Sequence, residues 1–311
     1  MRRQQQGVAL ITAVLIVALV TAAAVAMAAR QQVDIRRSAN IFSNDQAYLF
    51  ALGGEDYARN VLQFDADPNK GDPNVDHLGE FWAQPASFPV EGATLSGSVK
   101  DMQGRFNLNA LVDSGGRVST VRLEQFIRLL QLLDLNQDLA DGVVDWIDSD
   151  STPQFGPLGA EDDYYMLQDP PYRAANTLMK SASELRLIRG VDDETYQKLI
   201  PLVTALPVAD TAINVNTAPA EVLAALVGRG SVSLADGAGI VEEREGKEFA
   251  SIADFNHRTG NSVDISIADV KSSYFRVDAV AEFDQTRARL HSLLRRDGAK
   301  VEVLMRSRGS Y

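Results

Sequence analysis

The sequence has 311 residues, enough for more than one domain, and contains no cysteine. Without cysteine there is neither a disulfide framework nor a thiolate metal site, so a zinc ribbon is excluded. Lys and Arg number 30 against 42 Asp and Glu, which gives a net charge of −12. Because binding to a phosphate backbone depends on Lys and Arg, this surplus of carboxylates disfavours nucleic acid and is compatible with cations.

The chain begins with an apolar segment. Residues 8–29 carry no charge, and a helix of this length, at about 1.5 Å per residue, spans a bilayer core of roughly 30 Å. Ala26-Met27-Ala28 offers a small-x-small cleavage site, but the run is longer than the roughly 7 to 15 apolar residues of a secretory signal. The segment therefore predicts a membrane anchor that stays in the molecule.

A helical pattern continues past the apolar segment. Apolar residues recur at steps of three, four and seven, at Ile35, Ala39, Phe42, Leu49 and Leu52. This spacing predicts that residues 30–64 form an amphipathic stalk continuous with the membrane helix. The pair Gly53-Gly54 is the candidate for a kink in it.

A short leader precedes the apolar segment and consists of Met1-Arg2-Arg3-Gln4-Gln5-Gln6 followed by Gly7. Together with the helix that starts at Val8 and its amphipathic continuation, the leader resembles that of type IV pilins and pseudopilins. The resemblance implies that a prepilin peptidase cuts after Gly7 and methylates the new N-terminus, Val8. A glycine gives such a peptidase close access to the backbone. Arginines flank both sides of the segment, so orientation rests on the resemblance, which implies a single-pass protein of the bacterial inner membrane with its bulk in the periplasm.

Thr12 departs from the pilin pattern. Pilins within a filament carry Glu as the fifth residue after the leader, where it neutralises the amine of a neighbouring subunit, and this sequence has Thr12 there. Uncompensated charge in lipid is costly, so a subunit without that carboxylate suits a filament tip, where no subunit lies ahead of it.

This residue, the chain length and the patterns described below resemble the K subunits, minor pseudopilins of the type II (general) secretion system. The resemblance implies a subunit that caps the periplasmic pseudopilus, helps to initiate its assembly and helps to export folded proteins. The implied partners are other minor pseudopilins, the prepilin peptidase and the membrane, with secreted substrate proteins as further candidates.

The segment after the stalk is polar. Residues 65–89 are rich in Asp, Pro, Asn and Gly and predict a solvated connector. Residues 94–100 and 105–109 alternate apolar and polar side chains around a Gln103-Gly104 turn, which predicts a hairpin. Helical spacing then predicts helices over residues 118–135, 139–147, 181–188 and 192–205, the first with Ser119 or Thr120 as its N-cap.

A weak internal repeat runs through the helical part. Phe106-Asn107-Leu108-Asn109 and Ile213-Asn214-Val215-Asn216 each precede a helix, and each is followed later by Leu-Ala-Asp-Gly, at residues 139–142 and 234–237. The pattern indicates two related helical modules rather than a solenoid, although chance recurrence of a tetrapeptide produces the same pattern. Two tandem modules are also what the K-subunit resemblance implies.

The C-terminal part changes to strand patterning. Alternation over residues 274–283, 286–294 and 299–305, with turns at Asp284-Gln285 and Asp297-Gly298, predicts an antiparallel meander. The predicted fold class is α+β: a pilin-like fold with a long N-terminal helix packed on an antiparallel sheet, and a large inserted helical region. The expected divisions are the leader (1–7), membrane helix (8–29), stalk (30–64), first part of the pilin-like domain (65–114), a helical module with the acidic loop (115–212), a second module (213–271) and the C-terminal strands (272–311).

Carboxylates are densest in the first module, in Asp145-Trp146-Ile147-Asp148-Ser149-Asp150-Ser151-Thr152 and then Glu161-Asp162-Asp163. Alternate oxygens in such a loop can converge on a hard cation such as calcium, which takes roughly six to eight oxygen ligands. The spacing is not that of an EF-hand, because Pro153 and Gly159 stand at the sixth and twelfth places.

A solvated acidic loop explains this composition as well. The K-subunit resemblance implies a calcium-binding loop here and shifts the expectation to a structural calcium ion. The expected ligands are Asp148, Asp150, Thr152, Glu161, Asp162 and Asp163.

Two turns suggest a different function. Leu187-Ile188-Arg189-Gly190-Val191 and Phe255-Asn256-His257-Arg258-Thr259-Gly260 resemble the turn of helix-hairpin-helix domains, which bind DNA phosphates through backbone N–H groups. Residues 180–200 have no net positive charge, so a packing turn is favoured and no nucleic-acid partner is expected. The alternative is a tip subunit of a DNA-uptake or adhesive type IV pilus.

Enzyme activity is not expected. The three histidines, His77, His257 and His291, are far apart in the sequence and none lies in a paired metal motif. The sequence contains no phosphate loop, dinucleotide fingerprint or Gly-x-Ser-x-Gly motif.

Overall fold

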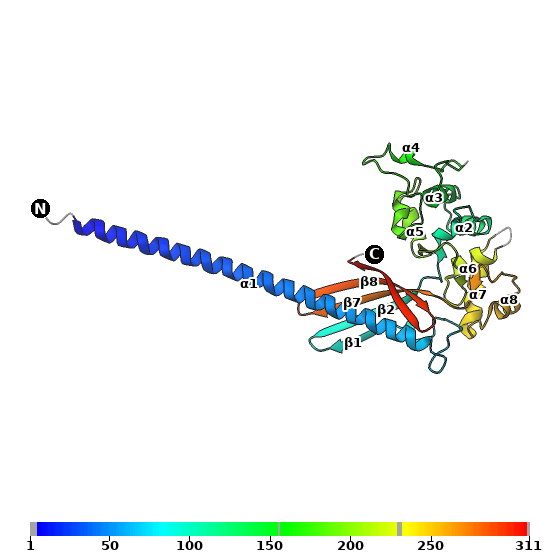
Figure 1. The fold of residues 1–311 in the computed structure, drawn as a ribbon, viewed down its shortest axis with the longest axis horizontal. Helices are drawn as coiled ribbons and strands as arrows, with labels where there is room; N and C mark the ends of the chain where they lie inside the picture. The colour runs from blue at the N-terminus through cyan, green and yellow to red at the C-terminus, as the bar shows by residue number, and fades with distance from the viewer. Residues whose placement is uncertain (1–4, 155, 229–231, 310–311) are drawn as a thin grey trace.

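The computed structural model describes residues 5–154, 156–228 and 232–309. Its first element, α1 (Gln5–Asp65), is a single helix of 61 residues. Side chains 8–42 are all exposed, and one face of the helix becomes buried from Ser43 onward. The N-terminal half of α1 therefore projects from the rest of the molecule (Figure 1). The predicted continuity of membrane helix and stalk is confirmed.

The C-terminal half of α1 packs on a five-stranded antiparallel sheet. The strands are β1 (Ala86–Val90), β2 (Ala93–Asp101), β7 (Tyr274–Phe283), β8 (Thr286–Asp297) and β9 (Lys300–Arg308), in the order β1-β2-β7-β8-β9. Ala51 and Leu62 of α1 share one buried cluster with Leu95, Phe275 and Leu290 of the sheet. The predicted C-terminal meander and its packing on the stalk are confirmed.

Gly54 makes close packing of α1 on the sheet possible. A Cβ atom at this position would lie 3.0 Å from Cδ1 of Leu95 and 3.2 Å from Cβ of Ala279. A larger residue would therefore push the helix away from β2 and β7. The structure assigns both Gly53 and Gly54 to the continuous helix.

The predicted hairpin over residues 94–109 is wrong. β2 forms, but it pairs with β1 and β7, whereas β3 (Phe106–Asn107) pairs in parallel with β4 (Val203–Thr204). Alternation shows that a segment has one buried face, but it does not identify the neighbouring strand. The turn between the two segments leads the chain out of the sheet and into the helical region.

Residues 65–89 are not a solvated connector throughout, so this prediction is also wrong. They include the 3-10 helix η1 (Phe81–Ala83) and the edge strand β1, and Asp76 and Trp82 are 1% and 2% exposed. Arg296 of β8 forms ion pairs with Asp65 and Asp76, and this positive charge compensates the burial of the two carboxylates.

Two helical modules lie at the end of the sheet remote from the N-terminus (Figure 1). The first contains β3, η2 (Leu108–Leu111), α2 (Thr120–Leu132), α3 (Leu139–Ile147), α4 (Asp162–Tyr165), η3 (Ala182–Leu187), α5 (Asp193–Leu199) and β4. The second contains β5 (Ile213–Asn214), α6 (Ala220–Val227), α7 (Leu234–Gly246), α8 (Ile252–Thr259) and β6 (Ala268–Asp269). The helix predicted over residues 181–188 is the 3-10 helix η3. The helix predicted over residues 192–205 is the shorter α5, which ends at Leu199, and the chain then enters β4.

The two Asn-x-Asn stretches have the same role in both modules. β3 pairs in parallel with β4, and β5 pairs in parallel with β6, so one short ladder joins the two ends of each module. The amide of Asn109 bonds the backbone N and O of Met179 at 2.8 and 2.9 Å, and that of Asn216 bonds those of Phe249 at 2.9 and 2.9 Å. This equivalence supports two related modules.

The modules differ in one connection. The first carries its acidic loop between α3 and η3, where the second has only residues 247–251 between α7 and α8. The acidic loop is therefore an insertion relative to the second module.

Candidate metal centre

The acidic loop is anchored by a carboxylate within α3. Asp145 is fully buried, and its oxygens accept hydrogen bonds from the backbone N–H groups of Gln154 at 2.9 Å and Ala160 at 2.7 Å. These bonds hold both arms of the loop against the end of α3. Asp148, at the C-cap of α3, and Glu161, at the N-cap of α4, are brought together in this way.

Three carboxylates meet at this point. Oxygens of Asp148, Asp150 and Glu161 lie within 4.8 Å of one another, and Asn176 Nδ2 donates to the backbone O of Asp150 at 2.9 Å. Oδ1 of Asp148, both carboxylate oxygens of Glu161 and Oδ1 of Asn176 are buried without a hydrogen-bond partner in the described chain. Unpaired buried acceptors are rare and cost roughly 1–3 kcal/mol each, or more when charged, so this set of oxygens is suited to hold a cation.

The same arrangement resists ionisation of its carboxyl groups. Burial, together with the charges of Asp150 and Asp145, raises the pKa of Asp148 to about 6. Burial, together with the charges of Asp145 and Asp148, raises the pKa of Glu161 to about 7. A divalent cation would relieve this repulsion, and a donor set of carboxylate and amide oxygens fits a hard cation such as calcium.

The structure does not bring the other three expected ligands into the group. Oδ1 of Asp162 accepts a hydrogen bond from the backbone N of Ala174 at 3.0 Å, and Oδ2 lies 3.6 Å from Arg173. Asp163 is exposed. Thr152 is also exposed, and its backbone N–H donates to Oδ1 of Asp150 at 2.7 Å, which orients that carboxylate.

Asn176 is the member of the centre that sequence reasoning missed. It lies 26 residues after Asp150, in a segment without regular secondary structure, and only the fold brings the two together. Its backbone has φ of 44°, a left-handed conformation in which Asn is enriched. No pattern in the sequence around Asn176 indicates this contact.

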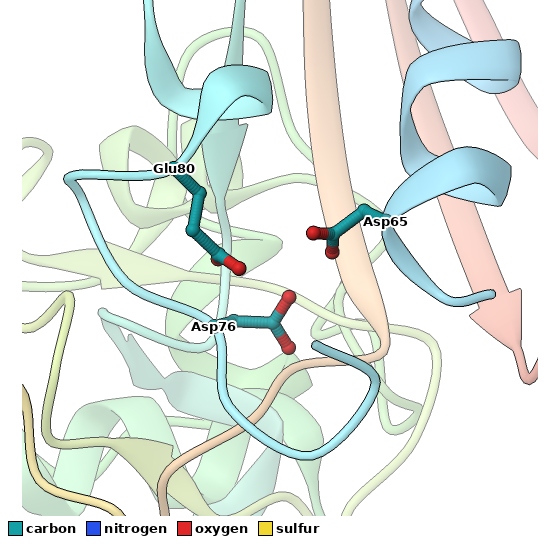
Figure 2. Close-up of side chains that lie close together, drawn as sticks. All are labelled: Asp65, Asp76 and Glu80. Carbon is teal, nitrogen blue, oxygen red and sulfur yellow. The ribbon is translucent and has the colours of Figure 1, made fainter. Parts of the chain in front are cut away.

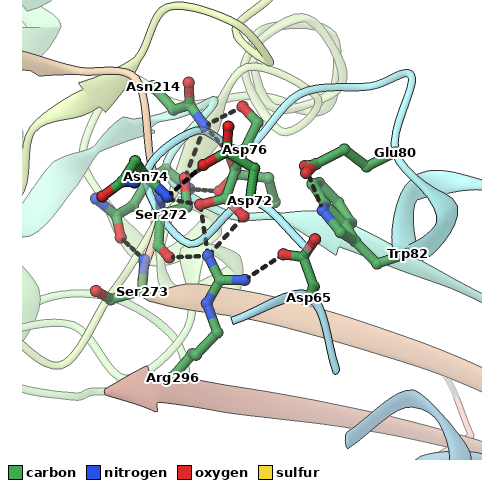
Figure 3. A network of polar contacts seen from close by, with 12 residues as sticks. Asp65, Asp72, Asn74, Asp76, Glu80, Trp82, Asn214, Ser272, Ser273 and Arg296 are labelled. Carbon is green, nitrogen blue, oxygen red and sulfur yellow. Dashed lines mark hydrogen bonds and ion pairs between the residues drawn. The ribbon is translucent and has the colours of Figure 1, made fainter. Parts of the chain in front are cut away.

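A second group of carboxylates, formed by Asp65, Asp76 and Glu80, is shown in Figure 2. Here the protein supplies its own cation, because Arg296 Nη1 lies 2.7 Å from Asp65 and Nη2 lies 2.5 Å from Asp76 (Figure 3). Glu80 accepts hydrogen bonds from the backbone N of His77 and the indole N–H of Trp82. We assign this group a structural role at the junction of α1 and β8.

The two groups differ in charge compensation. Within residues 5–154, 156–228 and 232–309, no ion pair is found for Asp148, Asp150 or Glu161, whereas one guanidinium serves both Asp65 and Asp76. The acidic loop, rather than the junction, is therefore the candidate metal centre.

The residues expected at the processing site lie in the first turns of α1. Gly7 and Val8 are both helical, and Val8 is exposed. The hydroxyl of Thr12 donates to the backbone O of Val8 and of Ala9, at 3.0 Å each. The hydroxyl is thus satisfied within its own helix, and Thr12 offers no charge to a neighbouring subunit.

The arginines of the two hairpin-like turns are used internally. The guanidinium of Arg189 lies 4.7 Å from the ring centre of Tyr164, and its Nη1 donates to the backbone O of Gly159 at 3.3 Å. Arg258 pairs with Glu243 at 2.9 Å and donates to backbone carbonyl groups of the α7–α8 connection. Through these contacts each arginine stabilises the helical module in which it lies.

Known proteins share this sequence over almost its whole length. The family described as "Type II secretion system (T2SS), protein K" is matched by residues 104–208 and 213–277. The type II secretion system protein K of Pseudomonas aeruginosa is 41% identical over 99% of this chain and 94% of its own length. That of Aeromonas hydrophila is 36% identical over 98% and 97%. The chain belongs to the type II secretion system protein K family.

A solved structure supports the family assignment. A chain in the crystal structure of the GspK-GspI-GspJ complex from the enterotoxigenic Escherichia coli type 2 secretion system has a TM-score of 0.76 and 27% identity, and the match covers 88% of the present chain and 100% of that chain. The expected fold class, a pilin-like fold with inserted helices, is confirmed.

Membership of the family makes this protein a minor pseudopilin, a structural part of a protein-transport system. The two matched regions coincide with the two helical modules, and the acidic loop lies in the first. The projecting part of α1 is long and apolar enough to serve as a single-pass membrane anchor.

Proposed function

We propose that this protein caps the tip of the periplasmic pseudopilus, helps to initiate its assembly and so supports export of folded proteins across the outer membrane. The observation that carries the proposal is Thr12. Thr12 stands at the fifth place after the leader and its hydroxyl is bonded to the backbone O of Val8, so the helix has no carboxylate at this position with which to neutralise the amine of a subunit ahead. A subunit of this kind is suited to the one position in a filament that has no subunit ahead of it.

The shape of the molecule supports the same role. Both helical modules lie at the end of α1 opposite the N-terminus (Figure 1). Such a large head at the distal end of the subunit would obstruct stacking of a further subunit above it.

The proposed site of action is the bacterial inner membrane. Residues 8–29 cross it once, the bulk of the chain lies in the periplasm, and the prepilin peptidase removes the leader after Gly7 and methylates Val8. The support is the projecting apolar helix and the position of Gly7 directly before its uncharged part.

The proposed partners are the other minor pseudopilins, which would be contacted through N-terminal helices and head domains. The crystal structure of the related E. coli chain is of a complex with GspI and GspJ, and the I and J subunits of the same secretion system are the partners we propose. Secreted substrate proteins are proposed as further contacts of the head.

We also propose a structural calcium ion in the acidic loop. Asp148, Asp150, Glu161 and Asn176 would hold it through their side-chain oxygens. The ion would supply positive charge that fixes the loop between α3 and α4 and takes no part in a reaction.

Immunogold labelling of the epitope-tagged protein on overproduced pseudopili tests the tip position. Label confined to filament ends is expected, and label along the filament sides would refute the proposal. Thr12→Glu restores a carboxylate, so we expect this variant to enter the sides as well, while the uncharged Thr12→Gln stays at the ends. Loss of secretion in a deletion strain that the tagged chain restores would show that the labelled protein is functional.

A further inference from the structure

Four carboxyl groups gather where α1, the sheet and the second helical module meet. They are Asp65 at the end of α1, Asp76 and Glu80 in the segment that follows it, and Asp101 at the end of β2. Arg296 of β8 forms ion pairs with Asp65 and Asp76, whereas within the described residues no ion pair is found for Glu80 or Asp101. We call these five residues the junction cluster. One guanidinium does not balance four buried or half-buried carboxylates, so we expect the cluster to keep a proton.

Glu80 is suited to carry this proton. Its carboxyl group points toward those of Asp65 and Asp76 (Figure 2), and oxygens of the three lie within 4.8 Å of one another. Asp65 and Asp76 contact the guanidinium, whereas Oε2 of Glu80 accepts hydrogen bonds from neutral groups, the backbone N–H of His77 at 2.8 Å and the indole N–H of Trp82 at 2.7 Å. Those two donors act to lower the pKa of Glu80. Burial, together with the charges of Asp65 and Asp76, outweighs them and raises this pKa well above its usual range.

Asp101 is compensated in a different way. Its carboxylate accepts hydrogen bonds from the backbone N of Gln103 at 2.7 Å and from the side chains of Asn214, Thr217 and Ser272 at 3.0, 2.5 and 2.6 Å. Burial raises the pKa of Asp101, but four donors stabilise its charged form. Glu80 is therefore the better place for the proton.

The other charged groups near Glu80 have partners of their own. The imidazole of His77 is turned to the backbone N–H of Gly79, which donates to its Nδ1 at 3.2 Å. Lys70, in the same segment, pairs with Asp67 at 3.1 Å. Across a pocket beside residues 77–79 lie two positive and two negative side chains of the second module, Arg244, Glu245, Lys247 and Glu248. Their charges balance, so they add no net positive charge near Glu80.

The junction cluster also holds both ends of the second module. Asn214, in the first strand of the module, donates through Nδ2 to the backbone O of Asp76 at 3.1 Å and to Oδ2 of Asp101 at 3.0 Å. Beyond the last strand, the backbone N of Ser272 donates to Oδ2 of Asp76 at 2.7 Å (Figure 3). The backbone N of Asp76 in turn donates to the O of Val270 at 2.8 Å. Displacement of the segment that follows α1 would therefore break the attachment of the module at both ends.

We propose that the junction cluster is a proton-sensitive attachment point, at which a protonated Glu80 keeps the second module fixed to the sheet. Loss of this proton at alkaline pH would place a third negative charge next to Asp65 and Asp76, which share one guanidinium. The repulsion would displace residues 66–80 from α1 and release both ends of the module. Because porins form water-filled channels in the bacterial outer membrane, a protein in the proposed periplasmic location meets the pH of the medium. The inference goes beyond the proposed tip role and does not depend on it.

Hydrogen exchange of the full-length protein in mild detergent, with calcium present throughout, tests the inference. Glu80→Gln is uncharged and keeps an oxygen for the two donors, so it mimics the protonated state. At pH 9 the backbone amides of residues 213–216 and 268–273 should exchange at least about tenfold faster in the wild type than in Glu80→Gln, and at pH 6 the two proteins should agree. Glu91→Gln removes the same charge at an exposed position and should behave as the wild type does.

Equal exchange in the wild type and in Glu80→Gln at pH 9 would overturn the inference. Faster exchange of the wild type that extends over β8 and β9 would also overturn it, because that result indicates general unfolding rather than release of the module. Comparison at equal pH removes the effect of pH on the intrinsic exchange rate. Neither outcome bears on the proposed tip position, which the labelling experiment tests separately.

Trp82 provides a direct measurement of the Glu80 proton, since its indole N–H donates to that carboxyl group. The chain contains two tryptophans, so Trp146→Phe leaves Trp82 as the only indole. Between pH 5.5 and pH 9 its fluorescence should follow a titration with a midpoint above pH 7, and Glu80→Gln added to this variant should abolish the titration. A midpoint at or below pH 7, or a titration that survives in the double variant, would overturn the inference.

Discussion

Arg306 of β9 and Glu55 of α1 form an ion pair across the interface between helix and sheet, with Arg306 Nη2 2.7 Å from Glu55 Oε1. Glu55 is 1% exposed, whereas the side chain of Arg306 is 47% exposed. Ser292 of β8 also donates to Glu55. Burial acts to raise the pKa of Glu55, but the hydrogen bonds and positive charge outweigh it, and the pKa is lowered. One carboxylate in the middle of an apolar interface thus fixes the position of α1 on two strands.

The two partners of this ion pair should differ in their effect on stability. Arg306→Met leaves a buried carboxylate uncompensated and should cost about 3–5 kcal/mol of unfolding free energy. Glu55→Gln leaves Arg306 free to reach water and should cost only about 1–2 kcal/mol. Urea unfolding at pH 7.5 measures both. A carboxyl whose pKa is lowered in the folded state stabilises the fold at pH values above its pKa in the unfolded chain, and this stabilisation disappears as the pH falls through its pKa in the folded state. The loss of unfolding free energy in Arg306→Met should therefore become smaller in acid. Equal losses in the two variants would contradict the assignment.

Calcium should raise the melting temperature of the protein relative to a chelator, because a ligand that binds only the folded state stabilises it, by about 2.7 kcal/mol at a hundredfold excess over Kd. Glu161→Gln removes a central ligand and should abolish the increase. Asp163→Asn changes the same net charge at an exposed position and should retain it. Differential scanning calorimetry provides the measurement, and a calcium response that survives in Glu161→Gln would argue against the centre.

The calcium-free protein should become less stable as the pH rises from about 4 to about 7. The pKa of Asp148 is raised to about 6 and that of Glu161 to about 7. A carboxyl whose pKa is raised in the folded state destabilises the fold progressively as the pH rises from its pKa in the unfolded chain to its pKa in the folded state. The calcium-induced shift in melting temperature should therefore be larger at pH 7.5 than at pH 5. A shift that is independent of pH over this interval would contradict the burial of these groups.

The amide clamps of the modules should be costly to remove. Asn216→Ala leaves the backbone N–H and C=O of Phe249 without their partners and should cost about 2–4 kcal/mol. Asn44→Ala removes a single exposed bond to its own helix and should change stability by less than about 0.5 kcal/mol. Chemical denaturation compares the two. A small loss in Asn216→Ala would mean that the clamp does not hold the second module together.

Substitution of Gly7 should leave the leader attached, since a side chain obstructs access of a peptidase to the backbone. Mass spectrometry of the protein extracted from membranes should find the wild type beginning at a methylated Val8 and a Gly7→Leu variant beginning at its original N-terminus. The Gly53→Ala variant provides a control for a general effect of glycine substitution. A wild-type N-terminus near residue 31 would instead indicate cleavage as an ordinary signal.

The sequence predicts those parts of the fold that depend on local periodicity. The limits of β7 and of α3 agree with the predicted segments 274–283 and 139–147, because alternation and helical spacing are properties of one segment. Pairing is not local. The partner of β2 on its second side is β7, far along the chain, and nothing within residues 94–109 indicates it.

The same limit applies to polar residues. In the sequence, Asp65 and Asp76 have the character of connector residues. The fold places Arg296 beside both of them, although it lies 231 and 220 positions further along the chain. In the acidic loop, residue type and spacing point to Asp148, Asp150 and Glu161, but the fold turns Asp162 toward Ala174 and brings Asn176 to Asp150. The sequence shows which residue types are available to form a site, whereas tertiary contacts decide which of those residues lie in it.

The unbroken course of α1 has a mechanical consequence. A helix of 61 residues is about 92 Å long, and its C-terminal half is fastened to the sheet by packing and by Glu55. With no hinge segment between membrane and head, any axial displacement of the anchor is passed on to the head in full. Withdrawal of the apolar part of α1 from the bilayer would therefore move the two helical modules outward by about 30 Å, the thickness of the hydrocarbon core.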